Sequence, residues 1–183
     1  MKKQSIFTIV SCLLFVFGSA QELSFGVKGG VNVSSVSGNA YVNLGGLTSK
    51  VSFHVGGVAE IPISDKFAVQ PELLFSSQGN QWNFSGDNLR LDYVNLPLLG
   101  KYYIIKGLSA EAGAVAGYLI STNDIKENFN SIDVAVAIGA SYKLNNNMFF
   151  SLRYNKGITN INSNDALDSS QNNVLQISAG YSF

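Results

Sequence analysis

One histidine and a serine two residues before it form the pair in this sequence most able to do covalent chemistry. His54 is the only histidine, and Ser52 lies on the same side of an extended segment. A serine, a histidine and a carboxylate together can cleave esters, because the imidazole takes the serine proton while the acid orients the imidazole. Across the short turn that follows, however, the residue opposite His54 is about Ser76, and no carboxylate is placed beside the histidine. We therefore predict a hydrogen-bonded interior histidine and no catalytic residue.

Charged residues recur on the polar side of the extended segments. Seven of them are predicted to face inward: Lys28, Glu60, Glu72, Lys101, Glu111, Asp133 and Arg153. Charges in a narrow interior need partners, because little water is present to solvate them. We interpret these residues as a structural network that fills the interior; a gate or a proton path is the functional alternative.

The turns indicate which of these charges meet. If one turn centres on Lys106, antiparallel pairing places Lys101 directly opposite Glu111. Glu60 and Glu72 fall opposite or diagonal to one another around another turn. Two carboxylates at such a short distance require a cation between them, supplied by Lys28, Lys101 or Arg153; otherwise one of the carboxylates is protonated.

Other ligand-binding chemistry finds little support. Asn162–Asp168 is rich in oxygen ligands but lacks the glycine and the distal glutamate of a calcium loop, so we interpret it as a solvated loop and predict no metal site; weak cation binding is the alternative. Gly26–Gly30 precedes no helix, which argues against a phosphate loop, and no cofactor is expected. Without Lys2 and Lys3, 10 basic residues remain against 12 acidic ones, so no nucleic-acid partner is indicated.

The elements that must position these side chains are segments in which apolar and polar residues alternate. There are about eight of them, at 23–33, 51–61, 67–76, 94–104, 108–120, 132–144, 150–155 and 173–183. Hydrophobic content is 46% and charged content only 13%, yet no apolar run after residue 20 is long enough for a membrane helix. This dispersed hydrophobicity predicts an all-β fold: an eight-stranded, antiparallel, up-and-down transmembrane β-barrel with a filled lumen. A soluble lipocalin-like barrel is the structural alternative.

The connections between these segments alternate in length. Ser64–Lys66, Ile105–Gly107 and Asn145–Asn147 are short, whereas Val36–Lys50, Gln78–Arg90, Ser121–Asn130 and Lys156–Asn172 are long. In outer-membrane barrels short turns face the periplasm and long loops face outside. Both termini are therefore expected in the periplasm. Outward aromatic residues also gather near the two ends of the segments, as in the two interfacial girdles of a membrane barrel.

The two ends of the chain agree with this prediction. Residues 1–20 have a basic start, an apolar stretch from Ile6 to Phe17 and a small-residue cleavage site, which is typical of a signal peptide. The stretch is too short for a membrane helix, and cleavage before Cys12, as in a lipoprotein, would leave an apolar run on the mature protein. Residues 21–183 form the barrel domain. The closing strand carries Tyr181 and Phe183 on its apolar face and resembles the C-terminal insertion signal of bacterial outer-membrane proteins.

Several motifs together resemble one family. They are Gly26–Gly30 after a signal peptide, Pro71–Phe75, Asn95–Tyr103, Glu111–Gly113 and the ending Gly180–Phe183. This pattern is similar to the PorT-like outer-membrane β-barrels of Bacteroidota over nearly the whole mature chain. The resemblance implies a Gram-negative outer-membrane location and leaves the activity open, since the porin label attached to this family is an analogy of fold. The founding member's link to type IX secretion suggests one possible role.

These observations favour a non-enzymatic barrel with a structural or surface-binding role, exercised through four extracellular loops. An accessory component of a secretion or transport system is the alternative, followed by a narrow channel or an outer-membrane enzyme that modifies lipids. The expected partners are outer-membrane lipids, the barrel assembly machinery and a surface ligand or secretion-system protein. A general diffusion pore is not expected, because the interior of eight strands is only wide enough to be filled by side chains.

Overall fold

A computed structural model shows eight strands that follow one another along the chain. It describes residues 23–37, 47–82, 88–124, 129–163 and 170–183, so the predicted signal peptide lies outside the described residues. The strands are β1 (Ser24–Ser37), β2 (Leu47–Ser64), β3 (Phe67–Trp82), β4 (Asn88–Ile105), β5 (Leu108–Thr122), β6 (Ile132–Lys143), β7 (Met148–Gly157) and β8 (Gln171–Ser182). The described part contains no helix with the length and hydropathy of a membrane span.

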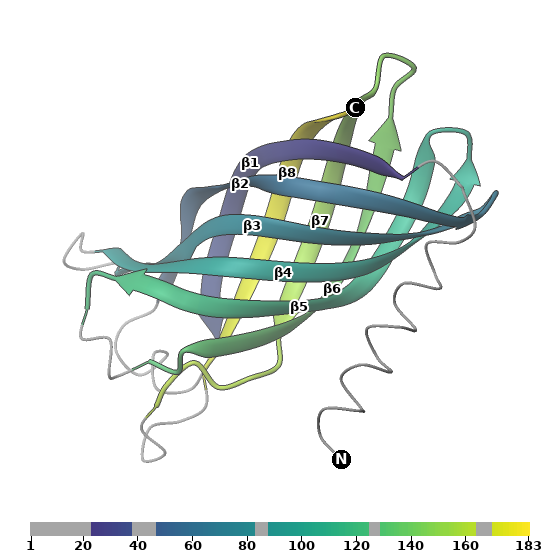
Figure 1. The fold of residues 1–183 in the computed structure, drawn as a ribbon. Coiled ribbons are helices and arrows are strands. Elements are labelled where there is room, and N and C mark those ends of the chain that lie inside the picture. The colour runs from purple at the N-terminus through teal and green to yellow at the C-terminus, as the bar shows by residue number, and fades with distance from the viewer. Residues whose placement is uncertain (1–22, 38–46, 83–87, 125–128, 164–169) are drawn as a thin grey trace, which may run out of the picture.

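Each strand pairs with its neighbours in sequence, and β8 pairs with β1 to close the barrel. All eight pairings are antiparallel, so the predicted fold class is confirmed. Tight turns join β2 to β3, β4 to β5 and β6 to β7 at one end of the barrel, where the C-terminus also lies (Figure 1). The strand ends that the longer connections join lie at the other end (Figure 1). Closure leaves no unpaired strand edge, which a structure immersed in lipid requires.

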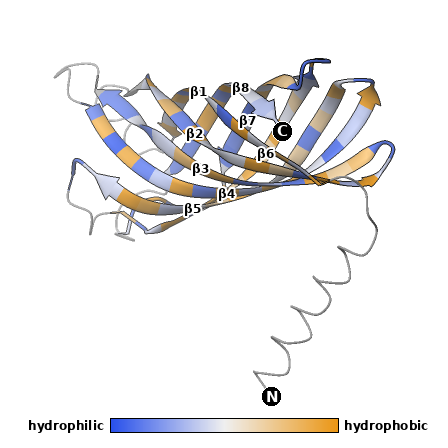
Figure 2. Cartoon of the chain, turned by 45° about the horizontal axis from the view of Figure 1, so that its top comes forward, coloured by the Kyte–Doolittle hydropathy of each residue, from blue (hydrophilic) through white to orange (hydrophobic). Residues whose placement is uncertain are grey.

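Side chains alternate between the outer surface and the lumen along every strand. On β5, Ala110, Ala112 and Ala114 are exposed on the outside, whereas Ser109 and Glu111, which alternate with them, are buried inside. The same alternation appears as bands of hydrophobic and hydrophilic residues along the strands (Figure 2). The apolar face therefore points outward. A lipocalin-like barrel, which buries its apolar face in the lumen, does not have this arrangement.

Two glycines allow close contact between strands inside the lumen. A Cβ atom at Gly30 on β1 would lie 2.0 Å from the carbonyl oxygen of Ile177, and one at Gly56 on β2 would lie 2.0 Å from that of Leu73. At Gly29, which faces outward, the nearest atom would lie 3.4 Å away. The inner side of this part of the wall has no room for a side chain, as expected where a small barrel is most crowded.

The strands extend further at the long-loop end than the sequence predicts. The predicted connection Gln78–Arg90 is wrong at both ends, because β3 continues to Trp82 and β4 begins at Asn88. β7 and β8 likewise extend into the predicted connection Lys156–Asn172. A strand that passes beyond the hydrocarbon region no longer needs an apolar outer face. The alternation that defines the strands in the sequence therefore fades before the backbone pairing stops.

Candidate functional site: the lumen and its two ends

The carboxylate of Glu72 on β3 lies at the centre of a buried ion network in the lumen. Arg153 on β7 donates to it through both terminal nitrogens, with Nη1–Oε2 and Nη2–Oε1 distances of 2.9 and 2.8 Å. The Nζ of Lys28 lies 3.2 Å from Oε2, and Gln70 Nε2 donates to Oε1 at 2.6 Å. This paired geometry is the strongest form of the arginine–carboxylate contact. It joins β1, β3 and β7 across the inside of the barrel.

Two further carboxylates extend the network toward the short-turn end. Arg153 Nη2 also contacts Glu111 Oε2 at 3.0 Å. Lys101 Nζ donates to Glu60 Oε2 at 2.8 Å and lies 3.9 Å from Glu111 Oε1. The network thus contains three basic and three acidic groups and is electrically balanced. Because every charge has a partner of opposite sign, the lumen can hold these groups without bulk water.

The pairings agree with the register expected from the turns. Lys101 lies opposite Glu111 in the β4–β5 ladder, as predicted. Glu72 lies opposite Val58, two residues from Glu60, so the two glutamates are diagonal. Each has its own cation, and no single residue bridges them. Of the seven interior charges named from the sequence, the structure brings together six.

Asp133 on β6 is the seventh, and it lies apart from the ion network. It accepts a hydrogen bond from Thr159 Oγ1 at 2.7 Å. No described lysine or arginine lies within ion-pair distance of it. Asp133 sits near the long-loop end of the lumen, so its environment differs from that of the other charges.

His54 has a hydrogen-bond partner on each ring nitrogen. Nδ1 lies 2.8 Å from Asn32 Oδ1, and Nε2 lies 2.8 Å from Ser178 Oγ. Asn32 Nδ2 donates to the carbonyl of Ser77 at 2.8 Å, which makes Asn32 Oδ1 an acceptor. Nδ1 therefore carries the proton, and Nε2 accepts from the hydroxyl of Ser178.

These contacts do not assemble a catalytic triad around His54. Ser76 is opposite the histidine, as predicted, and the hydroxyl of Ser52 donates to the carbonyl of Ser77 at 2.6 Å. Both ring nitrogens are engaged in the lumen, and neither contacts a carboxylate. The environment is that of a structural histidine.

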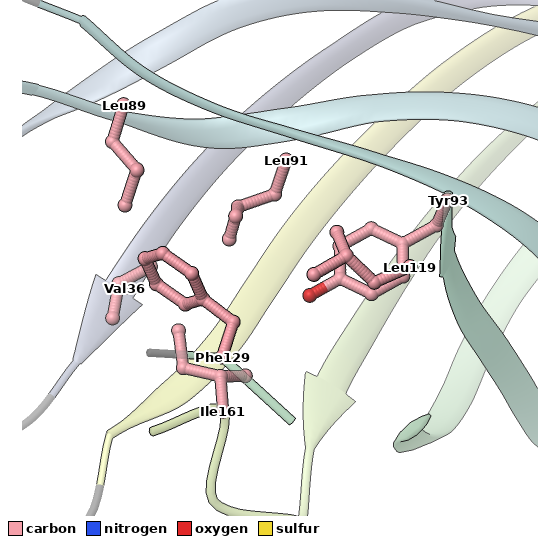
Figure 3. Close-up of a cluster of buried hydrophobic side chains, with 7 residues drawn as sticks. All are labelled: Val36, Leu89, Leu91, Tyr93, Leu119, Phe129 and Ile161. Carbon is pink, nitrogen blue, oxygen red and sulfur yellow. The ribbon is translucent and has the colours of Figure 1, made fainter. Parts of the chain in front are cut away.

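A cluster of buried apolar side chains lies at the long-loop end of the lumen, and we call it the plug. Figure 3 shows its seven side chains, from β1, β4, β5 and the connections after β5 and β7: Val36, Leu89, Leu91, Tyr93, Leu119, Phe129 and Ile161. Leu91, Leu119 and Ile161 have no solvent exposure. Burial of one leucine-sized side chain stabilises a fold by about 1.5–3 kcal/mol, so the plug is a substantial part of the core.

Hydrogen bonds join the two connections that contribute Phe129 and Ile161 to the plug. Phe129 pairs with Asn162 in an isolated β-bridge, and the backbone nitrogen of Asn130 donates to the carbonyl of Ile161 at 2.8 Å. The side chain of Asn130 adds bonds of 2.9 Å to the carbonyls of Asn160 and Asn162. The described parts of the connections after β5 and β7 are therefore tied to one another.

The sequence-based prediction missed the plug. Leu89, Leu91 and Tyr93 lie at every second position, in step with the inward-facing residues of the predicted strand that begins at Val94. This spacing is the signal in the sequence that could have revealed the earlier start of the strand. It was hidden because inward positions of a membrane barrel are expected to be polar. Phe129 and Ile161 lie outside the strands, where no periodicity applies.

The short-turn end is open where the other end is closed. A recess of about 900 Å3 there is lined in part by Ser24, Glu60, Tyr103, Lys143 and Phe183. The hydroxyl of Tyr103 donates to Glu60 Oε1 at 2.5 Å, so the charged network forms the inner wall of the recess. The lumen thus changes from charged at this end to apolar at the other.

The described residues contain no group of three or more histidine, cysteine, aspartate or glutamate side chains that could hold a metal. Of the oxygen-rich segment Asn162–Asp168, residues 164–168 lie outside the described part. Asn162 is buried, and its amide donates to Ser170 Oγ at 3.2 Å.

Residues 19–163 match the profile of the outer membrane protein beta-barrel domain family. The chain belongs to this family. By sequence, no curated protein matches the chain. The narrower resemblance to PorT-like barrels of Bacteroidota stays a prediction.

Two solved outer-membrane barrels share the fold. Ail, the attachment invasion locus protein of Yersinia pestis, superposes with a TM-score of 0.54 and 16% identity, covering 89% of this chain and 100% of Ail. Neisserial surface protein A superposes with a TM-score of 0.56 and 13% identity, again covering 89% of this chain and 100% of the other. At such low identity the likeness concerns the fold alone.

The outer surface carries the aromatic residues expected of an outer-membrane barrel. At the short-turn end, Phe67 lies opposite Tyr102 and Tyr142 lies opposite Phe150, all exposed. Toward the other end, the rings of Phe53 and Phe75 are in contact, with centroids 5.7 Å apart. Aromatic side chains at both membrane interfaces anchor a barrel at a fixed depth.

Proposed function

We propose that this outer-membrane barrel conducts no solute and catalyses no covalent reaction, and that its structural or binding role is exercised through its four extracellular loops. The observation that carries the proposal is the double closure of the lumen. The ion network fills its charged part, and the plug seals the end from which the long connections emerge. A barrel closed in this way leaves its loops and its periplasmic recess as the surfaces available to other molecules.

The proposal includes an orientation, with the short turns and both termini in the periplasm. Alternating connection lengths support this, because long connections typically face the outside. An accessory role in secretion would instead depend on a protein partner at the periplasmic side. Such a role is the alternative to a role at the cell surface.

Closure predicts the electrical behaviour of the purified protein. In planar bilayers, wild-type protein should show little steady current, because buried ion pairs leave no continuous water path. The variant F129A/I161A, which shortens two plug residues, should also stay closed, because the ion network remains. Large stable channels from wild-type protein would contradict the proposal. Heat-dependent migration of the same samples serves as the control for a folded barrel.

Orientation predicts which positions can be labelled from outside intact cells. Ser163→Cys, near the plug, should react with a membrane-impermeant maleimide, while Asn146→Cys, in the turn between β6 and β7, should be protected. The predicted leader contains the only native cysteine, Cys12. Both variants should react after the cells are lysed. The opposite pattern in intact cells would reverse the orientation.

A further inference from the structure

Between the ion network and the plug, the lumen contains a small cavity with a partly polar lining. It measures about 10 Å3, and the polar residues around it are Gln78, Asn95, Asp133, Asn155 and Asn172. This is about the space that one water molecule or an ion of similar size can occupy. Asp133 is the charged group among them, and of the seven interior charges predicted from the sequence it is the one that lies outside the ion network.

Two amide oxygens at this cavity receive no hydrogen bond from any described residue. They are Asn155 Oδ1 and Asn172 Oδ1, and both residues are almost fully buried, with 5% and 2% exposure. A buried acceptor without a partner costs about 1–3 kcal/mol. Two of them beside one carboxylate indicate that an electropositive species completes the site.

The orientation of Asn155 is fixed from outside the cavity. Asn32 Nδ2 donates to the carbonyls of Phe53 and Ser77, at 3.1 and 2.8 Å, which leaves Asn32 Oδ1 as an acceptor. Gln176 Nε2 donates to that oxygen at 3.0 Å. Gln176 Oε1 in turn accepts from Asn155 Nδ2 at 3.1 Å. These hydrogen bonds turn the amide nitrogen of Asn155 toward Gln176. The atom of Asn155 that lacks a partner is therefore its oxygen, Oδ1.

Asn172 is oriented in a similar way by an acceptor. Its Nδ2 donates to Gln78 Oε1. Because that carbonyl oxygen can only accept, the amide nitrogen of Asn172 faces Gln78, and its Oδ1 is left without a hydrogen bond from any described residue. The site therefore offers one carboxylate and two oriented amide oxygens.

We propose that this cavity is a binding site for a single Na+ ion, coordinated by Asp133, Asn155 and Asn172. Oxygen atoms of carboxylates and amides are the ligands of hard cations. The charge count selects a monovalent ion: Na+ neutralises the one carboxylate, whereas a divalent ion would leave a buried positive charge without a partner. One water molecule could donate to both amide oxygens but would bring no positive charge to the carboxylate of Asp133.

The position of the site gives the ion a role in holding the plug closed. Its three ligands come from β6, β7 and β8, the strands that flank the connections carrying Phe129 and Ile161. Gly117, which also lines the cavity, is in close contact with Tyr93 of the plug: a Cβ on this glycine would lie 3.3 Å from the ring. A bound ion would therefore cross-link the base of both connections directly beneath the plug.

Thermal unfolding in matched salts tests the proposal. Purified protein in detergent is heated in NaCl or in choline chloride of equal concentration, so that screening is the same. Na+ should raise the midpoint of unfolding by about 3–6 °C, the shift for a tenfold excess over Kd in a domain of this size. Asp133→Asn should abolish the difference, and Asp65→Asn, in the short turn after β2, should keep it. Equal midpoints for wild-type protein in the two salts, or an undiminished Na+ effect in Asp133→Asn, would overturn the proposal.

Two further measurements keep the test decisive if Asp133→Asn does not fold. Asn155→Asp adds a second carboxylate and should transfer the stabilising effect from Na+ to Ca2+. Crystals of wild-type protein soaked in Tl+ should show an anomalous peak among the three ligand side chains. A wild-type protein stabilised by Ca2+ but not by Na+, or a soak with no peak at this position, would contradict a monovalent site.

Discussion

Replacing Arg153 with methionine is expected to lower the free energy of unfolding by about 3–5 kcal/mol. The side chain is 1% exposed and is shared between Glu72 and Glu111. Methionine fills much of the same space but leaves the three glutamates of the network, Glu60, Glu72 and Glu111, with only two lysines. The cost therefore comes mainly from uncompensated charge, since the volume is nearly conserved.

Urea unfolding of the refolded barrel in lipid vesicles measures this loss. Lys156→Met is the matched control, because Lys156 lies three residues further along β7 and is exposed. It should change the free energy of unfolding by less than about 0.5 kcal/mol. An Arg153→Met variant as stable as Lys156→Met would show that the network contributes little to the fold.

A double variant separates the loss of the pair from the loss of one partner. Removing Glu72 as well, as Glu72→Met with Arg153→Met, returns the interior to charge balance, with Lys28 and Lys101 against Glu60 and Glu111. We expect the sum of the losses in free energy of unfolding for the two single variants to exceed the loss for the double variant. The difference, which is the coupling energy, should be about 1–3 kcal/mol. Strict additivity would mean that the two side chains act independently.

The fold was predictable because lipid imposes a simple rule on the sequence. A barrel wall must turn apolar side chains outward at every second position, and the resulting alternation is visible at Leu175, Ile177 and Ala179 as on the other strands. The same rule predicts the inward direction of His54. Where the chain leaves the hydrocarbon region the rule no longer applies, and the strand limits at the long-loop end were predicted wrongly for that reason.

Contacts inside the lumen were predictable only between adjacent strands. Lys101 and Glu111 are related by one short turn, so their pairing follows from counting residues. Glu72 and Arg153 lie on β3 and β7, which share no ladder, and their heights depend on the stagger accumulated around the barrel. No local sequence pattern gives this accumulated stagger. The same limit concealed the small cavity beside Asp133, whose lining residues come from several strands and meet only through packing across the lumen.

Deleting Phe183 is expected to reduce membrane-inserted protein in cells severalfold, far more than its contacts with the barrel would suggest. The ring is 75% exposed and meets Tyr181 edge-on, with centroids 5.7 Å apart. The backbone nitrogen of Phe183 donates to the carbonyl of Phe25 at 2.7 Å. Losing one aromatic anchor from lipid should cost only about 2–3 kcal/mol, which a closed barrel can survive.

The difference between cells and purified protein distinguishes an anchor from an insertion signal. If the assembly machinery binds the terminal aromatic residue, the truncated protein should still refold in detergent or thin lipid vesicles but should accumulate poorly in the outer membrane. Phe150→Ala is the control, because Phe150 is an exposed aromatic residue at the same end of the barrel and lies opposite Ala179 on β8. It removes a comparable anchor and leaves the C-terminus intact, so it should lower stability to a similar extent while inserting normally. Heat-dependent migration of outer-membrane fractions gives the inserted amount for each variant. Equal insertion of the truncated and wild-type proteins in cells would limit Phe183 to the role of an anchor.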